Sequence, residues 1–152
     1  MTNGLAGILT GANDEDLLYD LYVRIESPSN PSQLLFVDAW ELTGFIAGDG
    51  FEFLFEQDRS LDEFAQVLVE IGFSEAYPIF MKVKGLVPDA MLTKEYDSEL
   101  REHLANNFDI LRELLSEYLD LANAHLLSAF GSFIRDQRGD FADHLRSDTN
   151  DG

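Results

Sequence analysis

Hydrophobic positions recur at spacings of three and four over most of the 152-residue chain, a periodicity typical of amphipathic helices. Alternation with a period of two is absent, so no strand is predicted. We therefore predict an all-α fold, a single-domain helical bundle of about six to eight helices. Residues 14–146 are expected to form this domain, with a flexible or edge-packed N-terminus over 1–13 and a disordered tail over 147–152.

The first helix is predicted over residues 14–26. Asn13 or Asp14 can cap it, because a short polar side chain accepts hydrogen bonds from the free N–H groups of a first turn. Its apolar stripe consists of Leu17, Leu18, Leu21, Tyr22 and Ile25.

The second helix is predicted over residues 31–47, because Asn30 followed by Pro31 is typical of a helix start. An unpaired carboxylate is costly in a core, so Glu41 is expected at the rim or in a hydrogen bond. The spacing predicts the inward set Leu34, Val37, Trp40 or Glu41, Gly44 and Phe45.

A Gly-Asp-Gly turn follows this helix. Gly48 and Gly50 can take positive φ, and Asp49 can bond to local backbone, so the helix is expected to end here. A short helical turn over residues 51–57 is expected to bury Phe51, Leu54 and Phe55.

The next helix has clear signals at both ends. Ser60 and Glu63 have the spacing of a capping box, and Gly72 is the expected C-terminal cap. Ser74 is expected to cap the following helix, which ends at Gly85. The inward set of the first of these two helices is Phe64, Val67, Leu68 and Ile71.

From Thr93 onward the apolar pattern is long and helical. A single helix of this length is unusual in a small domain, so two or three helices are expected, ending near Gln137 or Gly139. The sites where the chain is expected to interrupt them are Asn106-Asn107 and then Asn123. A last short turn is predicted to place two apolar side chains on the body, Phe141 and Leu145.

Charge changes this picture most. The formal net charge is -19, from 29 Asp and Glu against 10 Lys and Arg. Such a chain repels the phosphate backbone, which argues against direct nucleic-acid binding and favours a basic protein as partner. No stretch is long and apolar enough for a membrane span, no basic leader opens the chain, and no cysteine is present, so we expect a cytoplasmic protein without membrane contact.

Catalytic and metal-binding patterns are sparse. Ser128 and Ser132 lack a Gly-x-Ser-x-Gly setting, and a carboxylate pair means little among 29 acids, so we expect no enzyme and no cofactor. The best metal candidate is a helical set near one face, namely Glu95, Glu99, Glu102 and His103. A solvated acidic face accounts for the same residues, so no metal site is predicted, and a carboxylate metal-binding protein is kept as a third alternative.

Acidic residues also form rows. Asp109, Glu113, Glu117 and Asp120 recur at spacings of four, four and three, opposite an apolar seam on the same predicted helix. Their charges would follow one another at roughly 6 Å, a spacing that can imitate part of a phosphate strand. Similar rows come from Glu95, Glu99 and Glu102, and from Asp14, Glu15, Asp16 and Asp20.

Two simpler interpretations compete with mimicry. Most charged rows on helices are solvated faces. An acidic surface poor in lysine is also how a halophile keeps its proteins soluble in high salt, and the lysines here are Lys82, Lys84 and Lys94. The alternative function is therefore a structural or housekeeping domain whose acidity reflects salt adaptation.

The central stretch carries a family resemblance. Its residues are Glu41-Leu42, Ala47-Gly48-Asp49-Gly50-Phe51, Phe53-Leu54-Phe55, and Ile71-Gly72-Phe73 followed by Ala76. They resemble the domain of unknown function typified by the DNA mimic protein nineteen family, whose hallmark is an Asn-Gly-Gly-Phe turn with trailing aromatics and a helix ending in Ile-Gly-Ala. The chain departs from that pattern at Ala47, at Asp49, and at Gln57 or Asp58.

The resemblance implies a function that composition alone does not. The characterised member of that family is an acidic, all-helical dimer that imitates DNA and occupies the DNA-binding surface of a transcription factor. It implies here a helical bundle, a possible homodimer, whose acidic face binds a basic partner such as a transcription regulator. The Gly48–Phe55 motif itself is expected to determine the fold rather than to bind.

Overall fold

The computed structural model describes residues 5–92 and 97–146, and within them all regular structure is helical. The predicted all-α single-domain bundle is confirmed. The elements are α1 (Ala6–Leu9), α2 (Glu15–Arg24), α3 (Pro31–Asp49), η1 (Phe51–Glu56), α4 (Leu61–Ile71), η2 (Ser74–Ala76), α5 (Tyr77–Gly85), α6 (Asp89–Leu92), α7 (Ser98–Asn106), α8 (Phe108–Asp136), η3 (Arg138–Phe141) and α9 (Ala142–Arg146), where η marks a 3-10 helix.

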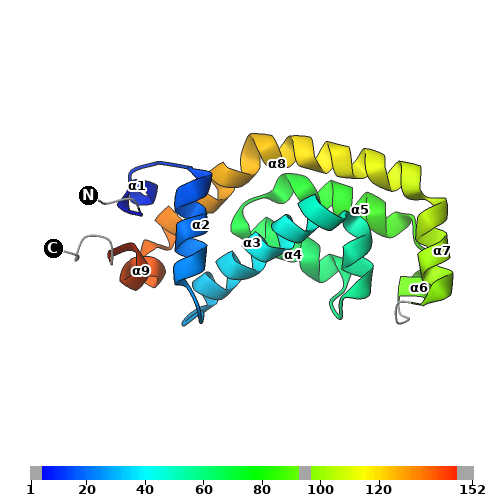
Figure 1. Cartoon of the computed structure of the whole chain (residues 1–152), viewed down its shortest axis with the longest axis horizontal. Coiled ribbons are helices and arrows are strands. Elements are labelled where there is room, and N and C mark those ends of the chain that lie inside the picture. Colours follow the sequence, from blue (N-terminus) through cyan, green and yellow to red (C-terminus); the bar gives the residue numbers. More distant parts are fainter. Residues whose placement is uncertain (1–4, 93–96, 147–152) are drawn as a thin grey trace.

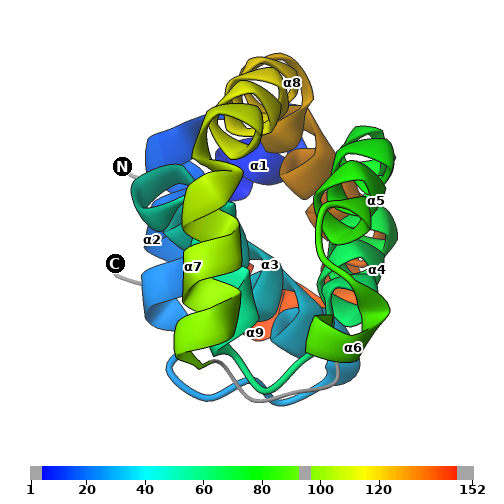
Figure 2. The same cartoon turned by 90° about the vertical axis from the view of Figure 1, so that its right-hand side faces the viewer.

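The long helix α8 runs along one side of the whole molecule (Figure 1). Helices α3, α4 and α5 lie beneath it, α2 crosses one end, and α7 closes the other end. Seen from the α7 end, α4 and α5 form one flank and α2 the other, with α8 above both (Figure 2). One apolar core therefore runs the length of the bundle and touches every long helix.

Helix α4 has the ends and the buried face that its sequence predicts. The Ser60 hydroxyl accepts from the Glu63 N–H at 3.2 Å, and the Glu63 carboxylate accepts from the Ser60 N–H at 3.2 Å, which completes the capping box. Gly72 ends the helix with φ of 105°, a left-handed conformation that glycine adopts without a steric penalty. The predicted inward set is buried, namely Phe64, Val67, Leu68 and Ile71.

Helix α3 begins as predicted, but its predicted inward face is wrong. The Asn30 side chain accepts from the Gln33 N–H at 2.9 Å, and Pro31 opens the helix. Leu34 and Phe45 are 59% and 47% exposed, Gly44 is exposed, and Val37 and Trp40 are half-buried. The face in the core consists instead of Gln33, Phe36, Ala39, Leu42, Thr43 and Ile46.

The reason for this error is that α3 is apolar on nearly all sides. A spacing of three and four can then be drawn along more than one face, and only packing against α4, η1 and α8 decides which is buried.

Helix α3 ends at Asp49, two residues later than the predicted end at residue 47. Gly48 is still helical, and only Gly50, with φ of 81°, leaves the helix in a glycine-favoured conformation. Phe51 and Leu54 then enter the core as expected, whereas Phe55 is half-buried.

The second half of the chain contains one longer helix than expected. Asn107 separates α7 from α8 as predicted, but α8 continues through Asn123 without a break to Asp136. Ser74 does not cap a helix with its side chain, because a 3-10 turn, η2, leads directly into α5. Both predictions, of a second interruption and of a Ser74 cap, are therefore wrong.

The two ends of the described chain are packed. Leu5 and Ile8 lie in the core, and Arg135 of α8 donates to the Ile8 carbonyl at 3.0 Å, so the described residues at this end pack on the body of the bundle. Phe141 and Leu145 are buried as predicted.

A polar cluster fastens the start of α3 to η3. The Gln33 amide donates to the Asp140 carbonyl at 2.7 Å, and the Asn30 amide donates to the same carbonyl at 2.8 Å. The Ser32 hydroxyl donates to the Asp140 carboxylate at 2.6 Å. Buried Gln33 is thereby satisfied, which is what a polar side chain in a core requires.

Candidate partner-binding surface

The predicted acidic row on α8 is in place on the outer side of that helix. Asp109, Glu113, Glu117 and Asp120 are all exposed, while the opposite side buries Leu111 and Tyr118 and half-buries Leu115. In the described part of the chain, one ion pair to the row is made by Lys82, whose Nζ lies 3.9 Å from Glu117 Oε1. Arg112 lies on the same helix three residues after Asp109, with its guanidinium 5.6 Å from the centre of the Phe108 ring. The core thus fixes the helix, and the carboxylates face solvent.

The second predicted row, on α7, is only partly described. Glu99 and Glu102 are exposed on α7, and Glu95 lies outside the described residues. The His103 ring does not join them, because its Nε2 lies 2.6 Å from the Leu86 carbonyl and is engaged there. No group of three or more potential ligands among the described side chains is placed to hold a metal ion.

The third predicted row lies at the start of α2, and one of its residues, Asp14, has a structural role. The Asp14 carboxylate accepts from the N–H groups of Asp16 and Leu17, at 2.8 and 3.3 Å, and so caps the helix. Glu15 and Asp20 are exposed. This row therefore supplies negative charge at the α2 end, but Asp14 is committed to the backbone.

The Gly50–Phe55 segment builds core rather than surface. The Phe51 ring packs edge-on against Phe80 and Tyr118, with centroids 5.6 and 5.7 Å apart. Tyr118 in turn contacts Phe73, just after Gly72. The motif that carries the family resemblance thus joins η1, α5 and α8 inside the bundle.

A groove of about 420 Å³ between α3 and α8 is the feature that the sequence interpretation missed. Its α3 wall contains Trp40, Gly44 and Ala47, and its α8 wall contains Leu119, Ala122 and Leu126. We call it the α3–α8 groove. The signal that could have revealed it is the surplus of apolar residues around α3, more than one buried face can use.

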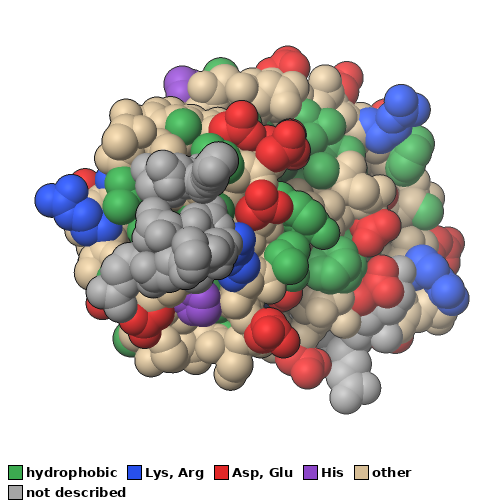
Figure 3. All heavy atoms as spheres, turned by 60° about the vertical axis from the view of Figure 1, so that its left-hand side comes forward, with side chains coloured by type: hydrophobic (Ala, Val, Ile, Leu, Met, Phe, Trp, Pro, Cys, Tyr) green, Lys and Arg blue, Asp and Glu red, His purple; other side chains and the backbone are tan. Residues whose placement is uncertain are grey.

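Aromatic side chains are exposed beside the groove at Trp40 and, separately, on the outer side of α3. Tyr19 of α2 is 53% exposed, and its ring lies 6.4 Å from Trp40, which also stacks on Tyr22 at 5.9 Å. On α3, Phe45 stacks on Phe53 at 4.7 Å. Figure 3 shows hydrophobic side chains gathered on one face with Asp and Glu side chains around them.

Glu41 lies at the edge of this aromatic group. The Tyr22 hydroxyl donates to Glu41 Oε2 at 2.7 Å, which meets the expectation that Glu41 is at the rim and hydrogen-bonded. That hydrogen bond to a carboxylate raises the pKa of Tyr22 above its ordinary value, because it favours the protonated phenol.

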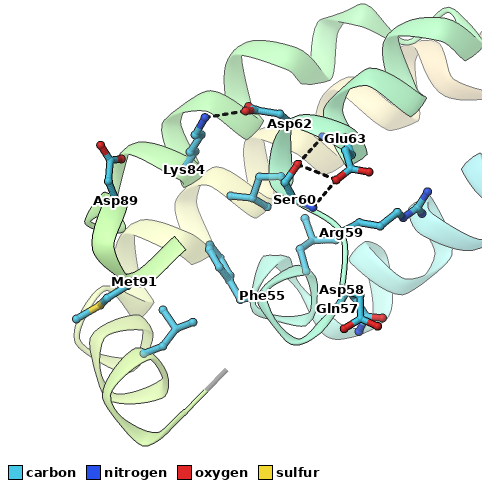
Figure 4. A pocket seen from close by; sticks show the side chains of 13 residues that line it. Phe55, Gln57, Asp58, Arg59, Ser60, Asp62, Glu63, Lys84, Asp89 and Met91 are labelled. Carbon is cyan, nitrogen blue, oxygen red and sulfur yellow. Dashed lines mark hydrogen bonds and ion pairs between the residues drawn. The ribbon is translucent and has the colours of Figure 1, made fainter. Parts of the chain in front are cut away.

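A second cleft, of about 590 Å³, lies beside the start of α4 (Figure 4). Its two cations are paired: Arg59 binds Asp38 at 2.7 Å, and Lys84 binds Asp62 at 2.8 Å. Each hydrogen bond to the carboxylate raises the pKa of the cation.

Ser60 and Glu63 of this cleft are also engaged. The Ser60 hydroxyl belongs to the capping box with Glu63. These groups hold α4 against α3 and α5, and their arrangement favours a structural role over a catalytic one.

Within the described residues, no helix combines the length and the apolar character needed to cross a bilayer. Comparison of the chain with protein-family models, with curated proteins and with solved structures found no match in any of the three.

Proposed function

We propose that this protein is a non-enzymatic acidic binding module that docks a basic protein through the outer face of α8. In its sharpest form it is a DNA mimic that occupies the DNA-binding surface of a partner such as a transcription regulator. The observation that carries the proposal is the row Asp109, Glu113, Glu117 and Asp120, four carboxylates exposed along one helix.

The rigidity of α8 supports this proposal. The helix has 29 residues, and its inner side is held by Leu111, Tyr118 and Phe130. The backbone positions from Asp109 to Asp120 therefore span roughly 16 Å along a packed helix, from a rise of about 1.5 Å per residue. A backbone ordered before binding loses little conformational entropy on binding, which favours affinity for a complementary cationic surface.

A four-residue neutralisation tests the proposal. We expect the variant Asp109→Asn, Glu113→Gln, Glu117→Gln, Asp120→Asn to lose a DNA-binding or other basic partner that the wild-type protein recovers from cognate lysate at low salt. Recovery should also fall steeply as salt rises, because opposed surface charges are screened.

The matched control neutralises four exposed acids elsewhere: Glu56→Gln, Asp58→Asn, Glu70→Gln, Asp89→Asn. It has the same change of net charge and should keep the partner. If wild-type protein recovers no basic partner at low salt, or if both variants lose it equally, the proposed α8 surface is wrong.

Salt adaptation is the second candidate, and the spread of the acids favours it. Exposed carboxylates occur on α2, α4 and α7 as well as α8. This candidate predicts that the isolated protein gains cooperative stability as KCl rises into the molar range. A flat or falling free energy of unfolding over that range would remove it.

A further inference from the structure

We infer that the α3–α8 groove binds a cationic amphipathic helix of the partner protein. This inference deepens the proposed function and rests on it, because it names the element by which a basic partner would be held. The acidic row of α8 attracts the partner, and the groove, whose α8 wall begins where the row ends, receives the partner's apolar side chains.

The walls of the groove are low enough for a helix. Gly44 and Ala47 on α3 and Ala122 on α8 are small, and a Cβ added to Gly44 would meet no atom within 4 Å. Two helices with small facing residues leave room for a third helix to pack at the usual interaxial distance. Trp40 and Leu126 also line the groove and offer larger apolar contacts.

The surface next to the groove has the character of a binding site. Trp40 lines the groove and is half-buried, and its ring lies 6.4 Å from the exposed ring of Tyr19 on α2. Large aromatic side chains dominate the energetics of protein interfaces, and monomeric proteins expose few such groups together. An apolar stripe with residues at spacings of three and four would cover them.

The rim of the groove selects the charge of that helix. Glu15 of α2 lines it, and Asp120 of α8 lies one turn from Asn123, which also lines it. Among the described residues, no Lys or Arg lines the groove. A helix that buries its apolar stripe here would therefore place its flanking side chains near carboxylates, which favours Lys and Arg at those positions.

Trp40 provides a direct measurement, because it is the chain's single tryptophan and lines the groove. The probe is a tryptophan-free peptide of about 18 residues, five helical turns, with Leu at spacings of three and four and Lys elsewhere. We expect it to shift Trp40 emission saturably. A peptide of the same composition in scrambled order should bind about tenfold more weakly or worse, and one with Glu in place of Lys should not bind.

Filling the groove tests the site itself. Gly44→Leu should lower the affinity for the peptide by about tenfold or more, because the new side chain occupies the middle of the groove. The matched control is Gly85→Leu on α5, also a helical glycine with open space around it, but outside the groove. It should bind like the wild-type protein. Thermal melting of both variants confirms that each is folded.

The outcomes separate this inference from the proposed function. If Gly44→Leu binds like Gly85→Leu, or the scrambled peptide binds as tightly as the ordered one, the groove is not the site. Loss of binding in the four-residue α8 variant would then still support an acidic binding module. If the four-residue α8 variant still binds the peptide and every basic partner, the proposed function is wrong.

A second copy of the chain is the competing occupant. Sedimentation of the free protein decides this, because a groove filled by another copy gives a dimer that Gly44→Leu converts to a monomer. That result would overturn the inference of a partner helix.

Discussion

Helices α3 and α4 are neighbours in the same core, yet only one of them could be oriented from its sequence. Helix α4 has one apolar stripe and polar residues elsewhere, and it buries that stripe. Helix α3 has apolar residues on most sides, so it buries Phe36 and Ile46 and leaves Leu34 and Phe45 exposed. The comparison teaches that a helix with more apolar surface than its core needs is where to look for a second contact.

The largest expected effect separates the two sides of α3. Phe36 is fully buried, with its ring 5.5 Å from Phe130 and 5.9 Å from Phe141. Phe36→Ala should lower the free energy of unfolding by about 3–5 kcal/mol through lost burial and a cavity. Leu34→Ala is the matched change on the exposed side and should cost less than about 0.5 kcal/mol. Urea unfolding measures both, and equal losses would mean that α3 is rotated about its axis.

A glycine-to-alanine pair compares the end of α4 with the outer side of α3. Gly72→Ala should lower stability by about 1–2 kcal/mol, since φ of 105° is strained for a residue with a Cβ. Space is not the cause, because the added Cβ would lie 3.7 Å from the Ala129 Cβ. Gly44→Ala, in regular helix, should raise stability by about 0.5–1 kcal/mol. Thermal unfolding should show a loss of stability for Gly72→Ala and a gain for Gly44→Ala. A gain of stability in Gly72→Ala would contradict the role of Gly72 as the helix cap.

A serine pair tests whether a cap recognised in sequence is also made. Ser60→Ala should lower stability by about 1 kcal/mol, because it removes the capping box at the start of α4. Ser74→Ala should leave stability within about 0.3 kcal/mol, because the Ser74 side chain makes no capping hydrogen bond. A comparable loss in both variants, measured by urea unfolding, would contradict this difference.

The smallest expected change in stability comes from a residue of α8, the helix that packs on both α3 and α4. The Tyr118 hydroxyl is buried and has no hydrogen-bond partner within the described part of the chain. Tyr118→Phe should therefore raise the free energy of unfolding by up to about 1 kcal/mol at neutral pH. A clear loss of stability would mean that the hydroxyl makes a stabilising contact.

The same residue predicts a pH dependence. Burial raises the pKa of Tyr118 above its ordinary value of 10.0, because the ionised phenolate is not solvated in the core. The unfolded chain ionises first, so stability is intact below pH 10.0 and falls as the pH rises from there toward the raised value. The free energy of unfolding, measured with urea between pH 9 and 11, should fall more steeply with pH for the wild-type protein than for Tyr118→Phe. Equal slopes would contradict a raised pKa of Tyr118 in the folded protein.

The parts of the fold that could be predicted are those specified by neighbouring residues. Asp14, Asn30 and Ser60 cap helices where the sequence places them, and Gly72 ends one. These signals work because a cap bonds to backbone groups two or three residues away. The exposure of the α8 row followed in the same way, from the helical period and the apolar seam opposite it.

Other features depended on distant segments and could not be predicted. Asn123 did not interrupt α8, because packing along the bundle outweighs the weak helix propensity of one residue. Leu5 and Ile8 joined the core through a partner more than 100 residues away, as shown by Arg135 binding the Ile8 carbonyl.

The sequence by itself determined an acidic, all-helical chain with most of its helix ends, because composition and local hydrogen bonding carry that information. The tertiary structure alone decided which side of α3 is buried, and with it the groove between α3 and α8. The physical reason is that burial depends on which surfaces meet, and a helix apolar on most sides contains no local preference between them.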